Sequence, residues 1–204
     1  MAVICDGIGG LSKGEQASGY VVRQMANWFM SVGYNKKGKK QHRNLQQFLF
    51  QIHEELKEYG KEKGISLGTT VTIILIDGKK LHWFHCGDCR LYLFRNRKVR
   101  KLTTDHHEKD GTLNRAIGVG EWDILESGKV NIRNEDRFLL CSDGLYKNLT
   151  IKELQRWFDK TILSDGQAER MLRQLFQKKI SEGERDNLSA LYFGYIKREE
   201  GEVI

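Results

Sequence analysis

The chain has 204 residues, of which 39% are hydrophobic and 30% are charged, a composition typical of a soluble protein with one core. Its apolar runs, such as residues 71–76 and 138–141, are too short to cross a bilayer. The first residues contain neither a basic segment nor a long apolar stretch, so no signal peptide is indicated. We therefore expect a cytoplasmic protein with no membrane partner.

The formal net charge is +7, and much of it comes from two basic clusters, at residues 36–43 and 95–101. Such a charge is compatible with nucleic acid, a membrane surface or a phosphorylated protein as partner. Charge alone does not choose among them, and clusters of this kind are commonly solvated loops. A nucleic-acid-binding domain would show a steep salt dependence of affinity. We do not expect nucleic acid to be the partner.

The four cysteines are too few for a disulfide scaffold in a chain of this length, so we expect free thiols. Cys5, Cys86 and Cys141 each end a short apolar run, where a thiol behaves as a small buried hydrophobe. Cys86 and Cys89 form a C-x-x-C pattern, but a structural zinc site needs further ligands and usually a second pair. We interpret that spacing as coincidental.

Two helices are predicted at the start of the chain by apolar residues at helical spacing. The first begins at a capping box formed by Ser12 and Glu15 and ends before Gly33. The second carries its apolar residues between positions 45 and 59 and is expected to close at Gly60.

The middle of the chain is predicted to form strands, because it is rich in β-branched and apolar residues and interrupted by turn signals. The strands are expected at residues 69–76, 80–86, 90–94, 98–102, 123–132 and 137–141. Asp77-Gly78 is the turn of the first hairpin. Two helices, from the Thr150 capping box to about residue 160 and from Ser164 to about 181, precede a last strand at 188–196. Consecutive hairpins with outer helices indicate one layered α+β domain, residues 1–197, followed by a polar tail, 198–204.

Four aspartates share one local pattern at the ends of predicted strands. Asp6 precedes Gly7, Asp88 follows Gly87, Asp143 precedes Gly144, and Asp186 precedes Asn187. Carboxylates brought together repel one another unless a cation neutralises them, and Mg²⁺ and Mn²⁺ take oxygen ligands. The pattern is what an all-oxygen metal site needs. Spacing alone does not show that the four converge, and Asp77-Gly78 and Asp110-Gly111 are interpreted as ordinary turns.

Seven short motifs occur in one order along most of the chain. They are D-G-I-G-G at 6–10 with G-E-Q-A-S at 14–18, G-T-T at 68–70, G-D-C-R at 87–90, L-T-T-D-H at 102–106, N-R-A-I-G at 114–118, S-D-G-L at 142–145 and D-N at 186–187. Each is weak alone. Together they resemble the metal-dependent protein phosphatases of type 2C (PPM), in their bacterial form.

This resemblance implies a four-layer αββα sandwich of two antiparallel sheets flanked by helix pairs. It implies that Asp6 bridges two cations, Mn²⁺ or Mg²⁺, that the Gly7 carbonyl binds one, and that Asp143 and Asp186 hold the first. Asp88, with Asp143, would contribute to a third, weaker site. A hydroxide bridging the two cations would attack phosphoserine or phosphothreonine in proteins. The implied partners are phosphorylated Ser/Thr proteins and a cognate Ser/Thr kinase.

The family's opening segment, R-x-x-N-E-D on its first two strands, does not stand before Asp6. We expect the first N-terminal strands to be missing from this sequence, and the chain as written to be a poor catalyst. The alternative function is a pseudophosphatase that binds a phosphoprotein or kinase without turnover. Nucleophilic catalysis through Ser142 is a further reading, but no histidine lies in a recognisable partner motif.

Overall fold

A computed structural model describes residues 1–9, 11, 13–32, 38–158 and 164–196, with the backbone alone for residues 32 and 38–43. Several sequence predictions lie outside the described residues: the Ser12 cap, the Gly33 stop, the helix end near residue 160 and the tail at 198–204. The side chains of the first basic cluster, at residues 36–43, are outside them as well. Within the described ranges, none of the helices is long and apolar enough to cross a bilayer.

The strands form two antiparallel sheets of four strands each. The first sheet has the order β1-β2-β3-β6, made of Ala2–Ile4, Val71–Asp77, Lys80–Cys86 and Glu126–Asn131. The second has the order β5-β4-β7-β8, made of Lys98–Lys101, Arg90–Arg95, Arg137–Cys141 and Ala190–Gly194. Short hairpins connect β2 to β3 and β4 to β5, as the turn signals predict.

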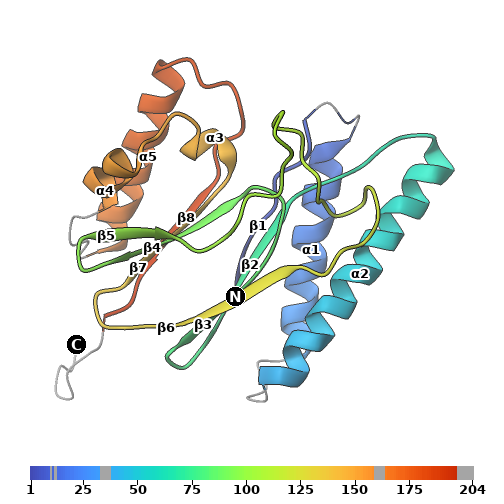
Figure 1. Cartoon of the computed structure of the whole chain (residues 1–204), viewed down its shortest axis with the longest axis horizontal. Coiled ribbons are helices and arrows are strands. Elements are labelled where there is room, and N and C mark those ends of the chain that lie inside the picture. Colours follow the sequence, from blue (N-terminus) through green and yellow to red (C-terminus); the bar gives the residue numbers. More distant parts are fainter. Residues whose placement is uncertain (10, 12, 33–37, 159–163, 197–204) are drawn as a thin grey trace.

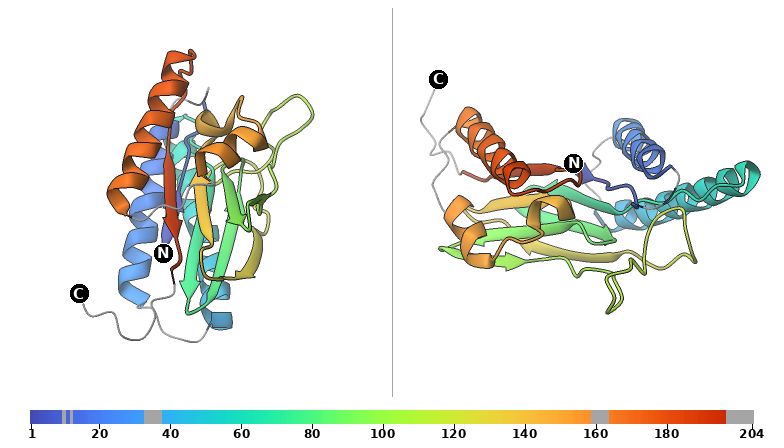
Figure 2. Two further views of the ribbon diagram at one scale, coloured as in Figure 1. Left: turned by 90° about the vertical axis from the view of Figure 1, so that its left-hand side faces the viewer. Right: turned by 90° about the horizontal axis from the view of Figure 1, so that it is seen from above.

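Two pairs of helices cover the outer faces of the sheets. The first pair is α1 (Gly14–Val32) and α2 (Gly38–Lys63); the second is α4 (Ile151–Phe158) and α5 (Asp165–Ser181). Figure 1 shows the strands between these two pairs, and Figure 2 shows the layers from two further sides. A one-turn helix, α3 (Asp143–Tyr146), directly follows β7. The predicted four-layer αββα sandwich is confirmed.

The core consists of three apolar layers, one at each contact between helices and sheets. Strand β4 shows why: Leu91 and Leu93 pack between the two sheets, whereas Tyr92 and Phe94 pack against the second helix pair. Successive side chains of a strand point to opposite faces, so a strand buried on both sides is apolar throughout. The third layer holds α1 and α2 against the first sheet.

The predicted stop of the second helix at Gly60 is wrong, because α2 continues to Lys63. The chain turns back immediately afterwards, and the Ile65 N–H donates to the Gly60 carbonyl at 3.0 Å. A Cβ at residue 60 would lie 2.7 Å from the Ile65 carbonyl oxygen. Glycine is therefore present here for close packing inside the helix.

The caps of the later helices agree with the sequence. Thr150 and Glu153 form the reciprocal bonds of a capping box: the Thr150 Oγ1 accepts from the Glu153 N–H at 3.2 Å, and the Glu153 carboxylate accepts from the Thr150 N–H at 2.9 Å. The Ser164 side chain accepts from Gln167 N–H at the start of α5. The predicted strand at 123–132 is shorter, Glu126–Asn131, and α3 was not predicted.

Candidate metal centre

Asp6 is fixed just beyond the end of β1 by bonds of its backbone. Its N–H donates to Thr70 Oγ1 at 2.9 Å, and its carbonyl accepts from the Thr70 N–H at 2.8 Å and from Thr69 Oγ1 at 2.8 Å. The next residue, Gly7, forms an isolated antiparallel bridge with Thr69. None of these bonds uses the Gly7 carbonyl. The two threonines just before β2 therefore hold the backbone of Asp6. None of these bonds uses the Asp6 carboxyl group.

Asp143 and Asp186 come together because their two chain segments are packed tightly. A Cβ on Gly144 would lie 2.7 Å from the Asn187 carbonyl oxygen and 3.2 Å from the Asp186 Cβ. The buried Ser142 hydroxyl donates to the Asn187 carbonyl at 3.0 Å and accepts from the Ser189 N–H at 3.1 Å. Both hydrogen bonds of this hydroxyl are made with backbone groups, which argues against Ser142 as a nucleophile.

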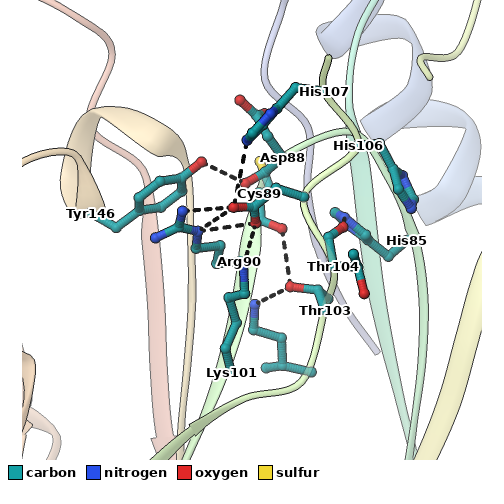
Figure 3. A network of polar contacts seen from close by, with 12 residues as sticks. His85, Asp88, Cys89, Arg90, Lys101, Thr103, Thr104, His106, His107 and Tyr146 are labelled. Carbon is teal, nitrogen blue, oxygen red and sulfur yellow. Dashed lines mark hydrogen bonds and ion pairs between the residues drawn. The ribbon is translucent and has the colours of Figure 1, made fainter. Parts of the chain in front are cut away.

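Asp88 follows β3 across Gly87, whose φ of +113° suits glycine. The Tyr146 hydroxyl, from α3, donates to the Asp88 carbonyl at 2.9 Å (Figure 3). The Arg90 guanidinium carbon lies 3.5 Å from the centre of the Tyr146 ring. Arg90 in turn donates from Nη2 to Asp105 Oδ2 at 2.6 Å and from Nε to both carboxylate oxygens. A stacked ion pair thus supports the backbone next to Asp88.

The four aspartates form one electrostatic cluster. Burial, followed by the neighbouring carboxylates Asp143, Asp186 and Asp88 in that order, raises the pKa of Asp6 to about 7. Burial, followed by the charge of Asp143, likewise raises the pKa of Asp88 to about 6. Carboxylates that raise one another's pKa in this way are neighbours in the folded chain, and a cation between them would relieve their repulsion. The structure therefore brings Asp6, Asp88, Asp143 and Asp186 together from four distant parts of the chain.

One oxygen of this cluster is buried without a partner. Oδ1 of Asp143 accepts no hydrogen bond from any described residue, although the atom is shielded from solvent. A buried acceptor left unpaired is costly, and a divalent cation would satisfy it. The donor set is carboxylate and carbonyl oxygen, which suits Mn²⁺ or Mg²⁺. The residues present therefore fit the ions that the sequence implied.

Lys147 brings a positive charge to the cluster. None of the sequence motifs identifies this residue. Its Nζ lies 2.5 Å from Asp143 Oδ2 and 3.4 Å from Asp186 Oδ2. Burial alone would lower the pKa of Lys147, but its hydrogen bond to Asp143 raises it overall. The available signal was the four-residue spacing from Asp143, which places the two side chains on one helical face.

Comparison with known proteins places this geometry in a family. A sequence model of the protein phosphatase 2C family matches residues 1–180. The chain belongs to this family. It is 25% identical over 176 residues to the serine/threonine phosphatase stp of Listeria monocytogenes serotype 4b, a match that covers 76% of this chain and 70% of the relative. These matches confirm the assignment as a protein-serine/threonine phosphatase of the type 2C kind.

Solved structures with the same fold include two bacterial-type matches of similar size. PppA of Pseudomonas aeruginosa, described as a key regulatory component of T6SS, is 25% identical with a TM-score of 0.81, covering 95% of this chain and 85% of that chain. The catalytic domain of the phosphatase PstP in complex with 2 manganese ions is 22% identical with a TM-score of 0.78, covering 96% and 87% of the two chains.

A second cluster in the phosphatase, His85, His106 and Glu126, could also hold a metal ion, since its potential ligand atoms lie within 4.8 Å of one another. Both ring nitrogens of His85 are already engaged, Nδ1 with Thr72 Oγ1 at 2.8 Å and Nε2 with the Thr104 carbonyl at 2.9 Å. His106 Nδ1 accepts from the Gly87 N–H at 3.1 Å. We interpret this cluster as a support for the loop that carries Asp88 (Figure 3).

Neighbouring residues of this cluster differ in exposure and in packing. The His107 side chain is 43% exposed, whereas that of His106 is 10% exposed. Cys86 packs between the first sheet and its helices, and Cys89 packs between the sheets. Burial raises the pKa of both thiols, so neither suits metal binding or redox exchange. We therefore assign neither a metal site nor a redox site to the C-x-x-C pattern.

Proposed function

We propose that this phosphatase hydrolyses phosphoserine and phosphothreonine in proteins with two divalent cations held by the aspartate cluster. The observation that carries the proposal is Oδ1 of Asp143, buried and unpartnered among carboxylates whose pKa values are raised. Such a group of mutually repelling oxygens is costly unless cations bind there. The family and the fold support the same conclusion.

The proposed role of each residue follows from its place in the cluster. Asp6, which interacts with all three other aspartates, would lie between the two cations. The Gly7 carbonyl, which is not used by the bridge to Thr69, would bind one of them. Asp143 and Asp186 would hold the first. When bound, the cations would supply a bridging hydroxide as nucleophile and neutralise charge on the phosphoryl group.

The proposed substrates are phosphorylated Ser/Thr proteins, because the relatives are named as serine/threonine phosphatases. A Ser/Thr kinase that phosphorylates the same proteins is the corresponding partner. Manganese is the first ion to test, since the PstP catalytic domain is described in complex with 2 manganese ions. Magnesium is the second, because both ions prefer oxygen ligands.

The test is hydrolysis of a phosphothreonine peptide by the purified chain after removal of metal with a chelator. We expect phosphate release that depends on added Mn²⁺. The variant Asp143→Asn should lower turnover by about 100-fold or more, since the loss of groups that merely orient metal ligands already costs about 10–100-fold. The matched control is Asp77→Asn, because Asp77 also ends a strand and precedes a glycine but lies in the β2–β3 turn.

Three outcomes separate the possible functions. Mn²⁺-dependent hydrolysis that is lost in Asp143→Asn and kept in Asp77→Asn supports the proposal. Equal activity of wild type and Asp143→Asn would remove Asp143 from the metal centre. Binding of the phosphopeptide and of Mn²⁺ without hydrolysis would instead favour a pseudophosphatase.

A further inference from the structure

Two hydrogen bonds hold the backbone of Lys147 next to the aspartate cluster. Its N–H donates to the Asp143 carbonyl at 2.8 Å, at the end of the one-turn helix α3. Its carbonyl accepts from the Nζ of Lys179, a buried lysine of α5, at 2.6 Å. The backbone of Lys147 is therefore fixed by both α3 and α5, and its side chain, which is 50% exposed, reaches the cluster from this fixed point.

The ammonium of Lys147 contacts the outer side of the cluster. It lies 2.5 Å from Oδ2 of Asp143, while the other oxygen of that carboxylate, Oδ1, is the buried atom without a partner. It also lies 3.4 Å from Oδ2 of Asp186. The two oxygens of Asp143 thus have different surroundings. Oδ2 contacts the Lys147 ammonium, whereas Oδ1 is available to a metal ion.

Asp88 is affected by the same ammonium. Burial and the charge of Asp143 raise the pKa of Asp88, whereas the charge of Lys147 acts in the opposite direction. Lys147 therefore lies near the two carboxylates, Asp88 and Asp143, that the sequence analysis expected to share a third and weaker ion. The ammonium thus contacts Asp143, one of the two carboxylates expected to bind that ion.

We infer that Lys147 replaces a third divalent ion, so that this phosphatase binds two ions and carries the third positive group in its own chain. Two divalent ions and one ammonium more than balance four carboxylates, which leaves the centre attractive to a phosphate group. An ammonium of the chain is present at any metal concentration. The inference rests on the proposed function, since it presumes that Asp6, Asp143 and Asp186 hold ions.

The number of Mn²⁺ ions bound per chain tests this inference without any measurement of activity. It is measured by equilibrium dialysis followed by metal analysis, for the wild type and for Lys147→Asp, Lys147→Gln and Lys152→Asp. Lys152 is an exposed lysine in the first turn of α4, so Lys152→Asp makes the same change of net charge away from the cluster. Circular dichroism identifies any variant that does not fold, and Lys147→Gln is the milder change.

We expect two ions in the wild type and in Lys152→Asp, and a third, weaker ion in both Lys147→Gln and Lys147→Asp. Lys147→Gln is the decisive variant, because it removes the ammonium without adding a ligand, and two ions in a folded Lys147→Gln would overturn the inference. Three ions in the wild type would overturn the inference, because the ammonium would then not take the place of an ion. Two ions in a folded Lys147→Asp would overturn it as well. No bound ion in any protein would instead contradict the proposed metal centre itself.

Discussion

Thr70 holds Asp6 by two reciprocal hydrogen bonds, from the Asp6 N–H to Thr70 Oγ1 at 2.9 Å and from the Thr70 N–H to the Asp6 carbonyl at 2.8 Å. Asp6 lies just after the first strand of the first sheet, and Thr70 lies just before the second. The side chain that is proposed to bridge two ions is thus positioned by a threonine far away in sequence. This relationship makes Thr70 a positioning residue of the centre.

The variant Thr70→Val keeps the shape of the side chain and removes the acceptor for the Asp6 N–H. We expect a loss of about 1–3 kcal/mol in the free energy of unfolding, because a buried donor is left unpaired. We expect Mn²⁺ affinity to fall by about 10–100-fold, as is typical when a group that orients a ligand is lost. Urea denaturation and calorimetry measure the two effects. Thr70→Ser retains the hydroxyl and is the control; unchanged Mn²⁺ affinity in Thr70→Val would contradict this role.

The ion pair of Arg90 with Asp105 is predicted to support the site through Tyr146. The Asp105 side chain is 9% exposed and that of Arg90 is 24% exposed, so Arg90→Met leaves a largely buried carboxylate with less compensation. We expect a loss of about 3 kcal/mol in the free energy of unfolding, measured by urea denaturation. Lys101 contacts the same carboxylate at 3.0 Å but is 35% exposed, and Lys101→Met should cost about 1 kcal/mol or less. Equal effects of the two variants would contradict the special role of Arg90.

The raised pKa values of Asp6 and Asp88 predict that these two groups make the metal-free protein less stable as the pH rises, whereas the lowered pKa of the buried His85 acts in the opposite direction up to about pH 6.5. The ordinary pKa of an aspartate here is 3.8, whereas that of Asp6 in the folded protein is about 7. Between these values the folded chain retains a proton that the unfolded chain has released, so the free energy of unfolding falls with increasing pH. Asp88, with a pKa of about 6, adds to the same trend.

Urea denaturation of the chelator-treated protein between about pH 5 and pH 8 measures this trend. Added Mn²⁺ should remove most of the loss at the upper end, because ions bound to the folded state stabilise it. The double variant Asp6→Asn, Asp88→Asn should show a flatter dependence on pH without metal. A double variant whose stability depends on pH in the same way as that of the metal-free wild type would contradict the prediction.

The sequence predicts the fold and the members of the aspartate cluster better than it predicts what supports them. Asp143 could be identified because a glycine follows it at the end of an apolar strand. Lys147 could not be interpreted, because its role depends on α3, on the segment before β8 and on Lys179 of α5 meeting at one place. The Arg90–Asp105 pair likewise depends on the start of β4 and the loop after β5, which meet only in the folded chain. Gly60 was misread as a stop, since packing against residue 65 is not visible in the sequence.

The cluster of His85, His106 and Glu126 is predicted to be structural. His106→Ala removes the acceptor of the Gly87 N–H, and we expect a loss of about 1–3 kcal/mol in the free energy of unfolding. The number of bound Mn²⁺ ions should not change. His107→Ala, at an exposed position, should lie within about 0.5 kcal/mol of the wild type. A lower number of bound ions in His106→Ala would make this cluster a metal site.

The most direct measurement for the aspartate cluster is a crystal structure of the chain grown with Mn²⁺, with anomalous diffraction data collected near the manganese edge. We predict anomalous peaks in contact with the carboxylates of Asp6, Asp143 and Asp186, and none between Lys147 and Asp143. Peaks only at His85, His106 and Glu126, with the aspartates unoccupied at saturating Mn²⁺, would contradict the proposed centre.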